Sequence, residues 1–145
     1  MDGLTVIVKK VSQLMCGLIF MYGIYIITHG HLTPGGGFAG GVILAGSFIL
    51  LILAYGSKVV KLRKEETMTT ITESMALLMV IILATVGIWL GSMHFFNNYL
   101  PKGEMGQLIS AGIIPIYNIL IGIEVTAAIL TIFLALVIFK EEVIS

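Results

Sequence analysis

Four apolar stretches, each close to the length that crosses a lipid bilayer, constrain this 145-residue chain more than any other feature. The hydrocarbon core of a bilayer is about 30 Å thick and takes about 20 helical residues. The stretches run over about residues 11–28, 38–55, 70–93 and 108–139. With 58% hydrophobic and only 11% charged residues, the composition is not that of a water-soluble domain. The sequence predicts an all-α membrane protein: one integral membrane domain, residues 1–145, with four transmembrane helices.

The fourth stretch is longer than one perpendicular helix needs, since it would measure about 48 Å at 1.5 Å per residue. It contains Pro115 and Asn118. A proline inside a helix removes a hydrogen bond and favours a break or a kink. We therefore expect a Pro-bent fourth helix, in which residues 108–118 form a bent or interfacial approach and residues 119–139 form the membrane span.

The basic residues predict how the helices are oriented, because short cytoplasmic segments collect Lys and Arg. With four helices, both termini share one side of the membrane with the connection between the second and third helices. That side holds all the basic residues except Lys102, namely Lys9, Lys10, Lys58, Lys61, Arg63, Lys64 and Lys140. The sequence thus predicts a multi-pass protein of the cytoplasmic membrane with both termini in the cytoplasm. Its formal net charge of zero gives no indication of a nucleic-acid partner.

The first loop, HGHLTPGGGFAGG at residues 29–41, is polar and rich in glycine. Its proline disfavours helical geometry in the residue before it, and the three glycines that follow permit a tight return into the bilayer. Overlapping G-x-x-x-G pairs then continue into the second helix, and this spacing lets helix backbones approach closely in lipid. The loop is either a turn followed by a helix-packing face or the lining of an ion path. The residues concerned are Pro34, Gly35, Gly36, Gly37, Gly40 and Gly41.

His29 and His31 lie in the same loop. They do not predict a metal site, because no cysteine or second acidic residue lies near them in the sequence. Two interpretations remain. Either they hydrogen-bond to loop carbonyls and water at the membrane surface, or they lie at the mouth of a proton path, since histidine titrates near physiological pH.

Glu124 is the acidic residue that lies deepest in the predicted spans, far from any basic residue in the sequence. A carboxyl group there must be protonated, paired or in contact with water, and such groups are functional candidates by default. The alternative is a protonated glutamic acid bonded to a neighbouring helix. Asn118 could join Glu124 in an ion path only if the helix is distorted near Pro115. Glu73 is explained by a position at the start of the third helix, where the helix dipole favours negative charge.

These motifs resemble the MnhB/MrpB family, the small membrane subunits of Mrp-type multisubunit Na+/H+ antiporters. The resemblance rests on GHLTPGGGFAGG, on the four helices, and on SAGIIPIYN before the last helix. IYNILIGIEV is closer to the equivalent subunits of archaeal respiratory complexes with an Mrp-like module, such as membrane-bound hydrogenases. Many bacterial members carry an aspartate where Asn118 stands, so the resemblance assigns the acidic function to Glu124 instead.

The resemblance implies an accessory or ion-path subunit, with Glu124, Asn118, His29 and His31 on the path of Na+ or H+. Its partners would be other membrane subunits of an Mrp-like complex and the lipid bilayer, with no cofactor and no catalysis of its own. A purely structural assembly subunit is the alternative. Small multidrug exporters carry their membrane glutamate in the first helix, which has none here. A redox enzyme is disfavoured because the chain has no cysteine cluster.

Overall fold

The computed structural model describes residues 5–56, 62–90, 94–104, 106–107 and 110–144. Most of them belong to four helices: α1 (Val6–Thr28), α2 (Gly37–Tyr55), α3 (Leu62–Trp89) and α4 (Ile114–Ile144). Each contains a segment long and apolar enough to span a membrane. These ranges contain no strand. The predicted all-α membrane fold with four transmembrane helices is therefore confirmed.

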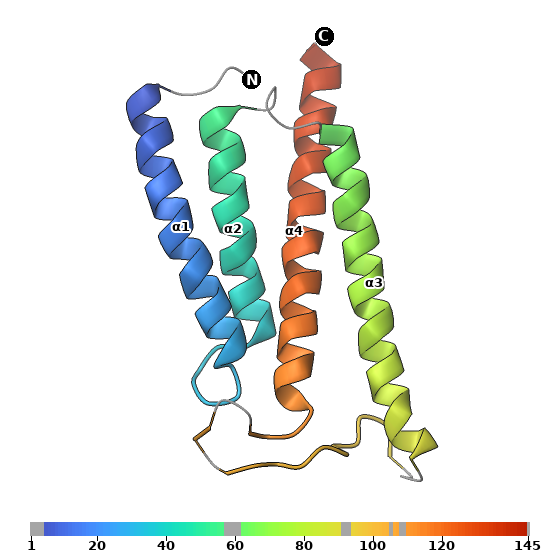
Figure 1. Ribbon diagram of the computed structural model, residues 1–145. Helices are drawn as coiled ribbons and strands as arrows, with labels where there is room; N and C mark the ends of the chain where they lie inside the picture. Colours follow the sequence, from blue (N-terminus) through green and yellow to red (C-terminus); the bar gives the residue numbers. More distant parts are fainter. Residues whose placement is uncertain (1–4, 57–61, 91–93, 105, 108–109, 145) are drawn as a thin grey trace.

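The helices stand side by side in the order α1, α2, α4, α3 (Figure 1). Consequently α4 lies between α2 and α3 and contacts both. α1 and α2 run antiparallel, as do α3 and α4, whereas α2 and α4 run in the same direction. We call the end of the row with the start of α1 and the end of α4 the terminal end. The opposite end, with the α1–α2 turn and the connection from α3 to α4, is the loop end.

Two helices extend further than their apolar stretches predict. α1 begins at Val6 rather than at about residue 11, and α3 begins at Leu62 rather than at about residue 70. The added segment LRKEETMT has no proline or glycine, so nothing in it stops the helical hydrogen-bond ladder. The predicted end of the third stretch, 91–93, and the start of the fourth, 108–109, lie outside the described residues. Hydropathy therefore located the spans but not the helix ends.

The start of α4 explains the role of Pro115. The helix begins at Ile114, so Pro115 lies in its first turn, where the missing N–H has no helical partner to lose. The preceding turn is held by Asn98, whose Oδ1 accepts from the Ile113 N–H at 3.0 Å and whose Nδ2 donates to the Ala111 carbonyl at 3.1 Å. From Ile114 onward the helix is continuous. Pro115 thus initiates α4 instead of bending its interior.

The glycines of α2 let three helices approach closely at the loop end. A Cβ at Gly40 would lie 2.9 Å from the Gly23 carbonyl of α1, and one at Gly41 would lie 2.8 Å from the Gly122 carbonyl of α4. These backbones meet because neither glycine carries a side chain, the mode of association that works in lipid. The contacts fix α4 against α2, and so position the residues at the start of α4.

Candidate functional site

The α1–α2 loop is a compact turn in which one backbone carbonyl accepts several hydrogen bonds. The His29 carbonyl accepts the N–H groups of Leu32 at 2.8 Å and Thr33 at 2.9 Å, and the Thr33 hydroxyl at 3.2 Å. Pro34 follows, and Gly36 takes a φ of 120°, a left-handed value that favours glycine. Gly36 then caps α2, its carbonyl accepting from the Gly40 N–H at 3.0 Å. The proline and glycines therefore bring the chain back into the bilayer within a few residues.

His29 is tied to the end of α1. Its Nδ1 lies 3.1 Å from the Tyr25 carbonyl and 3.1 Å from the Thr28 hydroxyl. The imidazole also stacks on the Tyr25 ring, with 4.2 Å between ring centroids. These contacts fix the ring at the helix terminus.

His31 reaches from the loop to the α3–α4 connection. Its Nε2 lies 3.5 Å from the Gln107 carbonyl, a long contact. Its Nδ1 is buried and has no hydrogen-bond partner in the described part of the chain. A buried ring nitrogen without a partner marks a place where a water molecule or another polar group is needed. His31 is thus the less constrained of the two histidines.

Asn118 packs against the α1–α2 loop from α4. Its Nδ2 lies 3.0 Å from the position of a Cβ at Gly30, and its Oδ1 lies 3.7 Å from that of a Cβ at Gly36. A Cβ at Gly37 would collide with the Asn118 backbone carbonyl. The Nδ2 is buried without a partner among the described residues. The structure therefore brings Asn118 together with the glycine loop, a contact that sequence reasoning missed.

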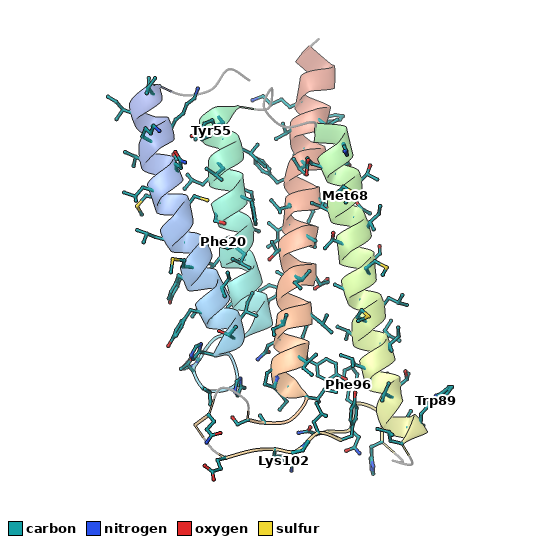
Figure 2. The ribbon with its side chains drawn as sticks, viewed as in Figure 1. Phe20, Tyr55, Met68, Trp89, Phe96 and Lys102 are labelled. Atoms are coloured by element: carbon teal, nitrogen blue, oxygen red, sulfur yellow. The ribbon has the colours of Figure 1, made fainter. Side chains whose placement is uncertain are left out.

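Tyr117 adds a second polar group at the start of α4, and it too was missed. The centroid of its ring lies 5.4 Å from the ring centroid of Phe96, a residue that Figure 2 shows at the loop end. Its Oη is buried and unpartnered within the described ranges. The only signal in the sequence was an amphipathic aromatic residue beside Asn118, where the chain enters the bilayer. Three buried polar atoms at this end of the bundle, on His31, Tyr117 and Asn118, thus have no hydrogen-bond partner among the residues that the structure describes.

Glu124 lies about two turns further along α4 and is half-buried. No hydrogen bond or ion pair joins its carboxyl group to the described residues. Because α4 is continuous from Ile114, Asn118 and Glu124 stay about 120° apart around the helix at 100° per residue. The structure does not bring them together: Asn118 faces the loop, whereas Glu124 lies seven residues before Thr131, on the line of α4 that contacts α3.

Glu73 requires a correction. Since α3 begins at Leu62, its first turn holds Glu65, and Glu73 lies well beyond it. The helix dipole acts within the first turn, so it does not explain a carboxyl group at Glu73. The residue is half-buried and lies inside the membrane-spanning segment Lys64–Trp89. The prediction is wrong because an apolar run marks where a helix enters the membrane, whereas the helix itself can begin several residues earlier.

The groups available here are amides, imidazoles, hydroxyls and carboxyls. Among the described residues, no three His, Cys, Asp or Glu side chains are grouped so that they could hold a metal ion. Oxygen ligands suit hard cations, and carboxyl and imidazole groups carry protons. The chemistry of these groups is compatible with hard cations and with protons.

Comparison with known proteins gives a family-level match. Residues 7–131 match the family described as a domain related to the MnhB subunit of Na+/H+ antiporters. The chain is 34% identical over 132 residues to the uncharacterized protein MJ1307 of Methanocaldococcus jannaschii, covering 88% of this chain and 50% of that protein. It is 40% identical over 55 residues to a Na+/H+ antiporter subunit from Bacillus subtilis, covering 38% of each.

A solved structure shares the fold. A chain of the membrane-bound sulfane sulfur reductase, described as an archaeal respiratory membrane complex, matches with a TM-score of 0.75 and 31% identity. The match covers 89% of this chain and 56% of that chain. This chain thus spans about half the length of both MJ1307 and the reductase chain.

Proposed function

Because this chain belongs to the MnhB family, we propose that it is an ion-path subunit of a multisubunit cation/proton antiporter module working in Na+/H+ exchange. The module either stands alone or forms part of a larger redox-driven membrane complex, in line with the similarity to a respiratory complex. The chain performs no catalytic step of its own. Its partners are the other membrane subunits of that complex.

The observation that carries the proposal is Glu124. A half-buried carboxyl group in the span of α4 has no hydrogen-bond or ion-pair partner in the described part of the chain. Holding such a group in lipid is costly, so it is retained where it serves an ion or proton pathway. The row of helices is open, which leaves room for a neighbouring subunit to complete that pathway.

The loop end supplies the second part of the route. Asn118 and His31 each present a buried nitrogen without a partner among the described residues, and His29 lies at the end of α1 nearby in sequence. Amide and carboxyl oxygens would suit Na+, whereas imidazole and carboxyl groups would suit H+. Since Asn118 and Glu124 lie on different faces of α4, the chain provides one wall of the route and a neighbour the other.

The orientation belongs to the same proposal. Lys102 lies at the loop end, as Figure 2 shows, while Lys9, Lys64 and Lys140 lie toward the terminal end. By the positive-inside rule the terminal end is cytoplasmic. A Lys102→Cys variant should react with a membrane-impermeant thiol reagent added outside intact cells, and the buried Cys16 should not. Reaction only after the cells are opened would reverse the orientation.

The alternative is a purely structural assembly subunit, which the glycine contacts between α1, α2 and α4 favour. Ion-gradient-driven transport in vesicles that contain the whole complex separates the two. We expect Glu124→Gln to abolish Na+ or H+ movement with normal assembly on a native gel. Glu104→Gln, at an exposed carboxyl group in the α3–α4 connection, is the matched control and should transport normally. Full transport by Glu124→Gln would leave only the structural role.

A further inference from the structure

A polar face runs along the side of α3 that packs against α4. In the terminal half of α3, the residues that are not exposed recur at spacings of three and four, which is the pattern of one helix face. They are Glu66, Thr69, Glu73, Ala76 and Val80. Thr69 contacts α4 directly, so this is the face that α4 covers. Glu73 therefore lies on the α3–α4 interface.

One hydrogen bond sets the register of that interface. The Thr131 hydroxyl of α4 donates to the Thr69 hydroxyl of α3 at 2.8 Å. Because the helices are antiparallel, one turn from Thr69 to Glu73 matches one turn back from Thr131 to Ala127. Glu124 is three residues beyond Ala127, about 4.5 Å along the axis. Glu73 and Glu124 thus lie within about one helical turn of the same depth.

α4 presents a matching polar face. Tyr117, Glu124 and Thr131 are seven residues apart, so they lie near one line on the helix, and all three are half-buried. The two threonines are satisfied, since Thr131 bonds to Thr69 and Thr69 donates to the Glu66 carbonyl at 2.9 Å. The Tyr117 Oη, by contrast, is buried without a partner among the described residues.

The carboxyl groups on these faces, in contrast to the threonine hydroxyls, have no hydrogen-bond partner among the described residues. No hydrogen bond or ion pair within the described ranges reaches Glu73 or Glu124. The described basic side chains of the neighbouring helix segments, Lys64 and Lys140, are exposed at the terminal end. The two carboxyl groups thus lie at similar depth on facing helices, and no hydrogen bond or ion pair among the described residues holds either one in place. The hydroxyls contribute to helix packing, whereas the carboxyl pair and the Tyr117 hydroxyl remain available to a mobile proton or to water.

We propose that the α3–α4 interface is a proton relay in which Glu73 is the second intramembrane carboxyl group beside Glu124. A proton passes from the Glu73 carboxylic acid to the Glu124 carboxylate, which leaves Glu73 ionised and Glu124 neutral. Glu73 takes its next proton from the terminal end, where Glu66 begins the same face. The inference rests on the proposed function of Glu124 and extends it to α3.

The test uses the assembled complex in vesicles with Glu73→Gln, Glu124→Gln and the double variant. Glu65→Gln, at an exposed carboxyl group in the first turn of α3, is the matched control. We expect each single variant to lose proton movement, the double variant to lose no more than the worse single variant, and the control to stay normal. A second measurement treats the native complex with a hydrophobic carbodiimide, which modifies protonated carboxyl groups in membranes. Mass spectrometry should then find both Glu73 and Glu124 modified, and the exposed Glu65 unmodified.

Several results would overturn the relay. Loss of transport in Glu124→Gln with normal transport in Glu73→Gln removes Glu73 and leaves the proposed function intact. Normal transport in both single variants removes both proposals. If the fold-losses of proton movement in the two single variants multiply in the double variant, the two residues act in separate routes. If Glu73→Gln does not assemble, or if both single variants are inactive, the labelling decides: a native complex in which Glu73 is never modified excludes Glu73 from the relay.

Discussion

The two sides of α4 are built in different ways. Toward α1 and α2 it meets glycines, and Gly122 lies against Gly41 with backbone close to backbone. Toward α3 it meets hydroxyl and carboxyl groups, with the Thr131–Thr69 hydrogen bond crossing the interface. At Gly41 the first interface has no space for an added side chain. The second holds groups that can gain or lose a proton.

This difference gives the two sides of α4 different properties. A backbone contact between glycines has a single geometry and no charge to change, so it fixes α4 relative to the loop. The α3–α4 interface instead holds half-buried carboxyl groups, which are functional candidates within a membrane span. We infer that the glycine interface holds the ion path in place and that the α3–α4 interface carries it.

A substitution in the glycine interface between α2 and α4 should have the largest effect on stability. A Gly37→Ala substitution places a Cβ against the Asn118 backbone carbonyl and 2.9 Å from the Ile121 Cβ, and neither backbone can yield. We expect the free energy of unfolding of the chain in detergent to fall by about 3 kcal/mol, which is the upper end of the range for overpacking. Thermal unfolding measures the loss. Gly46→Ala on the same helix is the control, because nothing lies within 4 Å of its Cβ position. Equal losses in both variants would contradict the close contact.

Much of this fold was accessible from sequence because hydropathy reports directly on the bilayer. The four spans and the return at Pro34 follow from chain length and turn chemistry. Glu73 was misinterpreted because a helix can extend beyond the membrane, so the end of an apolar run is not a helix terminus. The contact between Asn118 and the loop joins segments far apart in sequence, and no local pattern encodes it. The same holds for the Asn98 bonds that start α4.

A substitution at the loop end should have an effect of intermediate size on transport. If the loop end only packs, Asn118→Ala changes stability alone. If it belongs to the route, the variant removes an amide that faces the loop glycines, and transport should fall several-fold while the complex still assembles. The vesicle assay used for Glu124→Gln measures this. Ile119→Ala, on an exposed neighbouring position of α4, is the control. Normal transport in Asn118→Ala would restrict the route to the α3–α4 interface.

The smallest effect concerns a hydroxyl on the glycine side of α4. Thr126 donates to the Gly41 carbonyl of α2 at 3.1 Å and to the Gly122 carbonyl of its own helix at 2.6 Å. Thr126→Val keeps the shape and removes both bonds; a hydrogen bond between helices contributes about 0.6 kcal/mol in membranes. Thermal unfolding in detergent should detect a small loss, with unchanged transport. Thr85→Val is the control, because its hydroxyl bonds only within α3. A loss as large as that of Gly37→Ala would mean that hydrogen bonding, rather than close backbone approach, holds α4 against α2.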